Sequence, residues 1–149
     1  MLPIKKIVTT TDFSDPSREG VKTAVEMAEK FGAELILVHA LPPLRSTSGA
    51  TTVAGYYLPT VEEEMAVEAA GLAEDFLKET VPETITSGFR VLNGRPAEQI
   101  AELAEKENAD LIVIATHGES NWKEFFTGSV TERVIRRAKC PVLAVTRPE

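Results

Sequence analysis

The chain has 149 residues, 43% of them hydrophobic, so it is long enough to bury one sizeable core and too short for two ordinary domains. Sixteen basic and twenty-three acidic residues give a formal charge of -7, which disfavours nucleic acid and anionic membrane surfaces as partners. One cysteine, no signal-like apolar stretch at the start and no run of about 20 apolar residues predict a cytoplasmic protein with a single domain over 1–149.

Short apolar runs alternate with helical patterns in the first part of the chain. Residues 4–10 predict a strand, and Asp15-Pro16 then opens a helix that Gly32 ends. Residues 33–40, AELILVHA, predict a second strand that is apolar almost throughout. Such continuous apolar strands are typical of a sheet that is covered on both faces.

The second part of the chain begins with residues 41–59, which have no period and are rich in Pro, Gly, Ser and Thr. They predict a long loop, of the kind that often forms a lid or an interface. The remaining predicted elements are a helix that includes 61–77, a strand near 84–92, a helix opened by Pro96, a strand over 110–116, a helix over about 128–139 and a strand over 141–146. No linker or internal repeat divides the chain.

Five strands and four helices in this alternation predict one doubly wound, parallel, five-stranded α/β sheet with helices on both faces, a Rossmann-like fold. Such sheets bind ligands outside the carboxyl ends of their strands, where the strand order reverses. Thr10, Thr11 and Asp12 end the first strand, Ala40 ends the second, and 115–118 follow the fourth. We therefore expect these three stretches to converge on one crevice.

Residues 114–130, IATHGESNWKEFFTGSV, contain two glycines on either side of a polar stretch. Gly128-Ser129 stands where a helix is predicted to begin, and a helix N-terminus offers unpaired N–H groups and partial positive charge to an anion. Gly118 has no side chain to prevent close approach of its backbone to a phosphate. The alternative is that Gly118 only turns the chain and Ser129 only caps a helix.

The chain resembles the universal stress protein family, specifically its ATP-binding branch, which has a fold like that of the adenine nucleotide α-hydrolases. The resemblance covers essentially the whole chain and is carried by 4–17, 33–40 and 109–145. The family's ATP signature is Gly, two residues, Gly, nine residues, then Gly followed by Ser or Thr. The matching positions here are Ala115, Gly118, Gly128 and Ser129, so the spacing is intact and the first glycine is replaced.

The resemblance implies binding of ATP, or of ADP or AMP, with Mg²⁺ or Mn²⁺ held by the phosphates rather than by protein ligands. Residues near Thr10 and Asp12 would face the adenosine, 115–121 the ribose and phosphates, and 128–130 the phosphate tail. The implied nucleotide-binding residues are Thr10, Thr11, Asp12, Ala40, Ala115, Thr116, His117, Gly118, Glu119, Ser120, Asn121, Gly128, Ser129 and Val130. The methyl group of Ala115 is expected to weaken or shift binding rather than abolish it.

Several other functions fit the sequence less well. An adenylating synthetase or nucleotidylyl transferase needs an SGGxDS loop or an HxGH motif, but TTDFSDPS follows the first strand. A phosphorylated receiver needs an aspartate where Leu92-Asn93-Gly94 stands. His117 and Asp12 have no obvious nucleophile beside them, so no catalytic residue is predicted. The expected function is nucleotide-dependent stress response or signalling with slow or no hydrolysis; a weak ATPase and a dimeric scaffold without nucleotide remain open.

The last predicted strand, PVLAVT over 141–146, is apolar, uncharged and placed at one edge of the predicted sheet. Exposed edges are rarely left unpaired, so it is expected to pair with a second copy in a homodimer, as the family resemblance also implies. The alternative is that the last helix and the C-terminal tail cover it. The sequence names no downstream protein partner.

Overall fold

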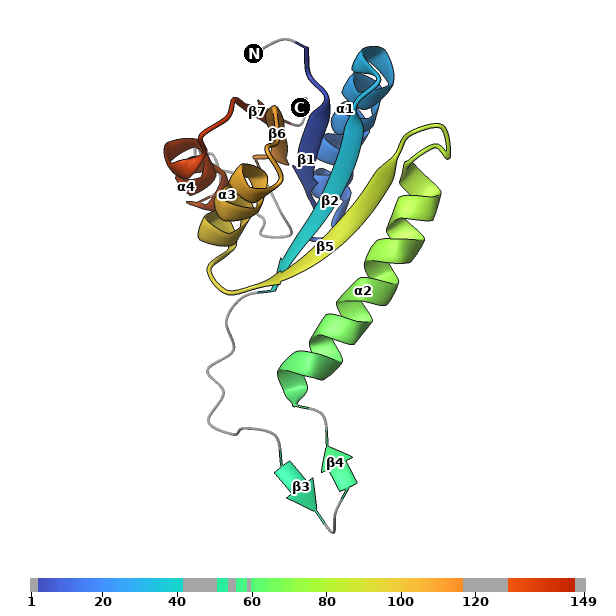
Figure 1. Cartoon of the computed structure of the whole chain (residues 1–149), viewed down its shortest axis with the longest axis vertical. Coiled ribbons are helices and arrows are strands. Elements are labelled where there is room, and N and C mark those ends of the chain that lie inside the picture. The colour runs from blue at the N-terminus through green and yellow to red at the C-terminus, as the bar shows by residue number, and fades with distance from the viewer. Residues whose placement is uncertain (1–2, 42–50, 54–55, 59, 117–128, 147–149) are drawn as a thin grey trace.

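The structure, a computed structural model, describes residues 3–41, 51–53, 56–58, 60–116 and 129–146. Its main sheet has the strand order β5-β2-β1-β6-β7, and all neighbouring strands are parallel (Figure 1). The strands are β1 (Lys6–Thr10), β2 (Glu34–Leu41), β5 (Ser87–Asn93), β6 (Leu111–Ala115) and β7 (Val142–Val145). The predicted doubly wound five-stranded sheet is confirmed.

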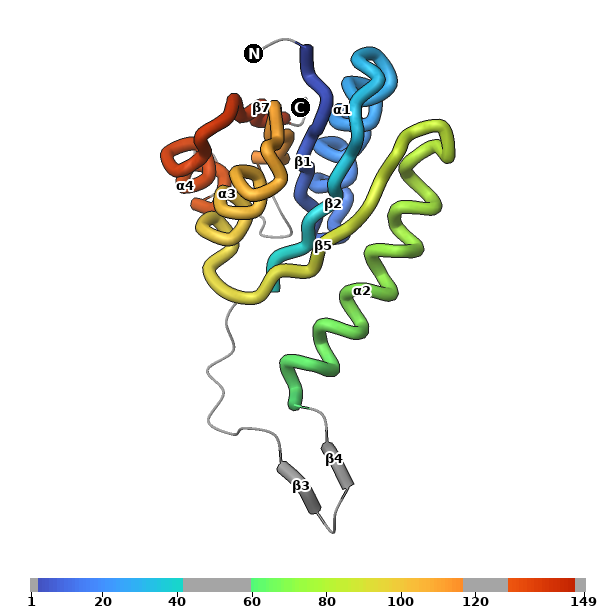
Figure 2. The backbone as a smooth tube through the Cα atoms, viewed as in Figure 1, coloured from blue at the N-terminus to red at the C-terminus, as the bar shows by residue number. Residues whose placement is uncertain are grey.

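Four helices cover the two faces of this sheet in the part of the chain that the structure describes (Figure 2). They are α1 (Asp15–Phe31), α2 (Val61–Thr80), α3 (Pro96–Lys106) and α4 (Ser129–Arg137). Alternate strand residues face opposite sides, so Ile7 and Leu35 pack with α1 and α2, whereas Val8 and Ile36 pack with α3 and α4. The central strands β1, β2 and β6 are therefore mostly buried, as their continuous apolar sequences predict, whereas the outer strands β5 and β7 are partly exposed.

The sequence signals for the helix ends act as predicted in α1. Its N-cap, Ser14, accepts a hydrogen bond from the backbone N–H of Ser17, and a proline stands in the first turn. Gly32 ends the helix with φ of 65°, in the left-handed region that favours glycine. These caps fix where β1 ends and where β2 begins.

The prediction of an unstructured loop over 41–59 was wrong in part. Leu41 belongs to β2, and Thr51–Val53 (β3) pairs antiparallel with Tyr56–Leu58 (β4), with Thr52 opposite Tyr57. Five of these six residues are β-branched or aromatic and favour strands, a local signal that the overall polar composition of 41–59 obscured. The sequence makes no prediction about closure of this segment over a ligand, and 42–50, 54–55 and 59 lie outside the described residues.

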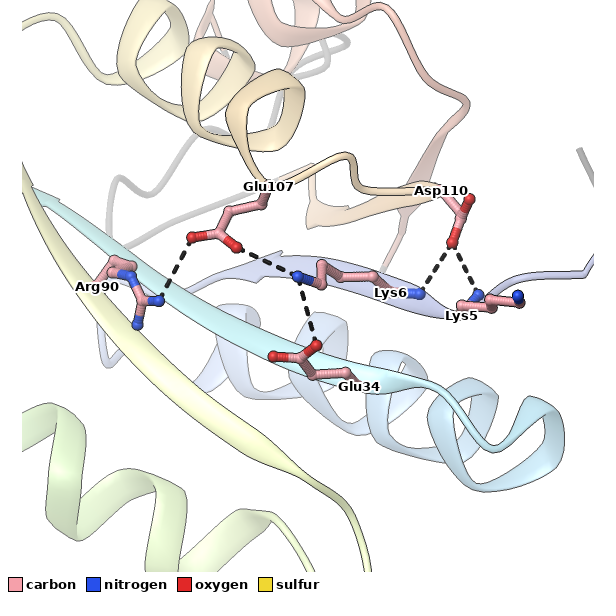
Figure 3. A network of polar contacts seen from close by, with 6 residues as sticks. All are labelled: Lys5, Lys6, Glu34, Arg90, Glu107 and Asp110. Atoms are coloured by element: carbon pink, nitrogen blue, oxygen red, sulfur yellow. Dashed lines mark hydrogen bonds and ion pairs between the residues drawn. The ribbon is translucent and has the colours of Figure 1, made fainter.

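A network of ion pairs fixes the amino ends of the first two strands (Figure 3). Lys6 Nζ lies 3.2 Å from Glu107 and 3.4 Å from Glu34, and Arg90 lies 3.4 Å from Glu107. The hydrogen bond between Lys6 and Glu107 raises the pKa of the Lys6 ammonium group and lowers the pKa of the Glu107 carboxyl group. Asp110 accepts the backbone N–H of Lys6 at 3.0 Å. These polar groups lie near the amino ends of β1 and β2, at the end of the sheet opposite to the predicted crevice.

Candidate functional site

The candidate site lies where β1 and β6 end side by side at the carboxyl edge of the sheet. The two strands are paired through Thr9 and Val113, and the chain leaves them in opposite directions. After β1 it enters α1 and joins β2 on one side, and after β6 it enters α4 and joins β7 on the other. This is the reversal of strand order at which such sheets bind ligands.

The turn after β1 is held by a set of short polar contacts. The Oδ1 atom of Asp12 accepts the backbone N–H of Ser14 at 3.0 Å and also accepts the Ser14 hydroxyl. Thr11 Oγ1 accepts the backbone N–H of Phe13 at 2.9 Å and lies 2.9 Å from the Ser17 hydroxyl. The exposed carboxylate of Asp12 is thereby oriented before any ligand arrives.

Phe13 adopts φ of 64°, which is unusual for a bulky residue. Its ring lies 4.6 Å from the ring of His39 and 5.7 Å from the ring of Phe76, measured between centroids. His39 Nδ1 lies 2.8 Å from the carbonyl oxygen of Thr11; because a carbonyl only accepts, this nitrogen donates. The side chain of His39 is therefore committed to packing and to holding the turn after β1.

The carbonyl and amide groups at the end of β6 are held by two neighbouring elements. The hydroxyl of Thr131, in the first turn of α4, donates to the carbonyl of Ala115 at 3.0 Å. The backbone N–H of Thr116 donates to the carbonyl of Val145 in β7 at 2.9 Å. Thr116 and Thr131 are both buried, with 4% and 3% of their surface exposed, so these contacts are sheltered from water.

The structure brings together one part of the predicted site. Thr10, Thr11 and Asp12 lie at the end of β1, next to Ala115 and Thr116 at the end of β6. Ala40 lies on β2, on the other side of β1, and Ser129 and Val130 form the exposed first turn of α4. The predicted residues outside the described ranges are His117, Gly118, Glu119, Ser120, Asn121 and Gly128. Nucleotide contact by any of these residues stays a prediction.

Sequence reasoning missed the residues that hold the end of β6. Thr131, Val145 and the helical glycine Gly20 contact Ala115 or Thr116 from three different elements. A small residue within the apolar face of the first helix was the only signal for Gly20, and it is weak because small residues are common on buried helix faces.

A cleft of about 500 Å³ between the start of α3 and α4 also went unpredicted. Val130, Arg133 and Arg137 line it from α4, and Arg95 and Glu98 line it from the other side. Glu98 forms ion pairs with Arg137 at 3.1 Å and with Arg95 at 3.4 Å. The cleft places basic side chains beside Val130, next to the predicted position of the phosphate tail.

Metal and thiol chemistry find little support in the described residues. No group of three or more His, Cys, Asp or Glu side chains within those ranges could hold a metal ion. Burial raises the pKa of the half-buried Cys140 thiol, which disfavours the reactive thiolate. No helix of the described part is long and apolar enough to cross a membrane.

Comparison with known proteins adds independent information. A sequence model of the universal stress protein family matches residues 3–146. The chain is 35% identical over 149 aligned residues to universal stress protein MJ0531 of Methanocaldococcus jannaschii, which covers 97% of this chain and 84% of that protein. The solved structure of MJ0577, from the same organism, has a TM-score of 0.76 and 26% identity over 98% of both chains. A universal stress protein crystallised with cAMP has a TM-score of 0.68 and 27% identity over 97% of this chain and 98% of that one.

Proposed function

The chain belongs to the universal stress protein family, and from that membership we propose that it is an ATP-binding stress-response or signalling protein with slow or no hydrolysis. The observation that carries the proposal is the position of Ser129. It opens α4 at the carboxyl edge of the sheet, and the contact from Thr131 to Ala115 joins that helix to the end of β6. Ser129, the last position of the ATP signature, thus stands at a helix N-terminus, where an anion is favoured.

ATP fits the residues that surround this helix end. Ser129 offers a hydroxyl and helix N–H groups to phosphate oxygens, while Asp12 offers an oriented carboxylate at the end of β1. The complex of a relative with cAMP supports an adenine nucleotide as the ligand class. Mg²⁺ or Mn²⁺ would be held by the phosphates, as such ions usually are with nucleotides. We propose that the protein acts in the cytoplasm as a homodimer paired through β7.

ATP with Mg²⁺ should raise the melting temperature of the protein. A ligand that binds only the folded state adds about 2.7 kcal/mol at a hundredfold excess over its Kd. For a chain of this size, that corresponds to a rise of roughly 5 to 10 °C. The measurement is a thermal melt with increasing ATP, with cAMP and inorganic triphosphate compared at equal concentrations.

These comparisons separate the two halves of the proposed site. If both adenosine and phosphates contribute, ATP should stabilise more than either cAMP or triphosphate. Melting that does not respond to ATP at millimolar concentration would contradict the proposed function. A larger shift with cAMP than with ATP would contradict the choice of ATP.

ATP turnover should fall far below about 10 s⁻¹, the median for enzymes. Hydrolysis needs a base positioned for water, and the sequence predicts none; in the described ranges, Asp12 and His39 each use one atom to hold the turn after β1. Asp12 Oδ1 accepts from Ser14, and His39 Nδ1 donates to the carbonyl of Thr11. Phosphate release from purified protein with excess Mg²⁺ and ATP measures the rate; turnover near the enzyme median would mean that the protein is an ATPase.

A further inference from the structure

Gly20 lies at the closest approach between α1 and the end of β6. It is buried, and a Cβ atom added there would lie 3.0 Å from the backbone nitrogen of Ala115 and 3.2 Å from its Cβ. The first of these atoms belongs to the backbone, which cannot rotate away as the tip of a side chain can. By contrast, a Cβ atom added at Gly71 in α2 would meet nothing within 4 Å. Glycine at position 20 therefore allows α1 to approach the end of β6 this closely.

The segment that Gly20 touches is fixed on its other sides as well. Thr131 holds the carbonyl of Ala115 from α4, and Val145 holds the N–H of Thr116 from β7. A side chain at position 20 would press on Ala115. The Ala115 carbonyl is hydrogen-bonded to the first turn of α4, so the two would have to move together. The displacement would reach Thr116 and the first turn of α4 at Thr131.

We propose that Gly20 is a positioning residue for the end of β6, Ala115 and Thr116, an inference that rests on the proposed function, which assigns these two residues to the nucleotide site. Gly20 and Ala115 form a packing pair in which the missing side chain of one makes room for the methyl group of the other. The ATP signature has glycine where this chain has Ala115. The pair explains how the chain accommodates that alanine, because its methyl lies against α1 and the close contact contains one methyl group.

The test exchanges the two small residues and measures ATP binding with Mg²⁺ by calorimetry. Gly20→Ala should weaken ATP by about tenfold, because two methyl groups then compete for one space. The double variant Gly20→Ala with Ala115→Gly should recover part of the loss, because the 3.2 Å contact between the two Cβ atoms is removed while the 3.0 Å contact with the backbone nitrogen remains. Gly71→Ala is the matched control and should bind ATP normally. Unchanged affinity in Gly20→Ala, or no recovery in the double variant, would overturn the proposal.

Measurements of stability distinguish a positioning role of Gly20 from a general loss of folding. Alanine favours helix over glycine, so both single helix variants should melt cooperatively, and Gly71→Ala at or above the wild-type temperature. Without nucleotide, hydrogen exchange at the Thr116 amide should be about tenfold faster in Gly20→Ala than in wild type, and part of this increase should be lost in the double variant. Unchanged exchange would overturn the positioning role even if affinity fell. If wild type itself does not bind ATP, the proposed function fails, and the exchange result alone decides whether Gly20 holds the end of β6.

Discussion

Replacing Gly128 by Val should weaken ATP binding at least about tenfold, or 1.4 kcal/mol. Gly128 immediately precedes Ser129, the first residue of α4, so it stands beside the N–H groups expected to bind the phosphate tail. A branched side chain at that point would occupy the approach of the anion to the helix end. Calorimetric titration with ATP and Mg²⁺ measures the change.

Two comparisons distinguish lost binding from lost folding in this variant. Gly128→Val should retain a cooperative melt, because the change leaves the apolar residues of the two core clusters unaltered. Ser129→Ala removes one hydroxyl and keeps the backbone donors, so it should weaken ATP by a smaller factor. Wild-type affinity in a folded Gly128→Val protein would show that the phosphates bind elsewhere and that Gly128 only forms a turn.

The layout of the sheet could be predicted because its signals are local. The apolar run 33–40 and the helix ends at Asp15-Pro16 and Gly32 depend on neighbouring residues alone, and they appear in the structure within about a residue of the expected places. The strand predicted near 84–92 begins later, at Ser87, which is its first residue paired with β2. Composition misled the prediction only for 41–59, where a hairpin of two short strands escaped notice.

The candidate site was predictable in position and only partly in its contacts. The rule for doubly wound sheets places Asp12 and Ala115 at one edge, and the register of β1 and β6 confirms that placement. The contact between Gly20 and Ala115 could not be predicted, because it depends on how closely α1 approaches the sheet. The contact between the rings of His39 and Phe13 likewise depends on the unusual backbone conformation at Phe13, which no sequence pattern predicts.

The edge strand β7 is the surface through which the proposed homodimer would form. β7 has β6 on one side and no strand on the other within the described part of the chain. The carbonyls of Pro141 and Val145 accept N–H groups from Ile112 and Thr116. Because the direction of backbone groups alternates along a strand, the N–H and C=O groups of Val142 and Ala144 point to the open edge. These are the groups that a second copy would pair with in the proposed homodimer.

Replacing Ala144 by Pro should convert the proposed dimer to a monomer. The proline removes the outward N–H at the centre of the edge and places its ring where the partner strand would lie. No bond between β7 and β6 is lost, because the Ala144 N–H does not point toward β6. The variant should therefore keep a cooperative melt. Light scattering on the order of tens of micromolar protein measures the mass of each form.

Ala144→Ser is the matched control for this experiment, because it alters the same half-buried position and keeps the backbone N–H. It should remain dimeric if pairing of the backbone drives assembly. Leu143, with 37% of its surface exposed, adds apolar area beside the same edge. A wild-type protein that is monomeric at these concentrations would contradict the dimer. A dimeric, folded Ala144→Pro protein would instead place the interface on another surface, since an edge that has lost its central donor cannot form a regular ladder.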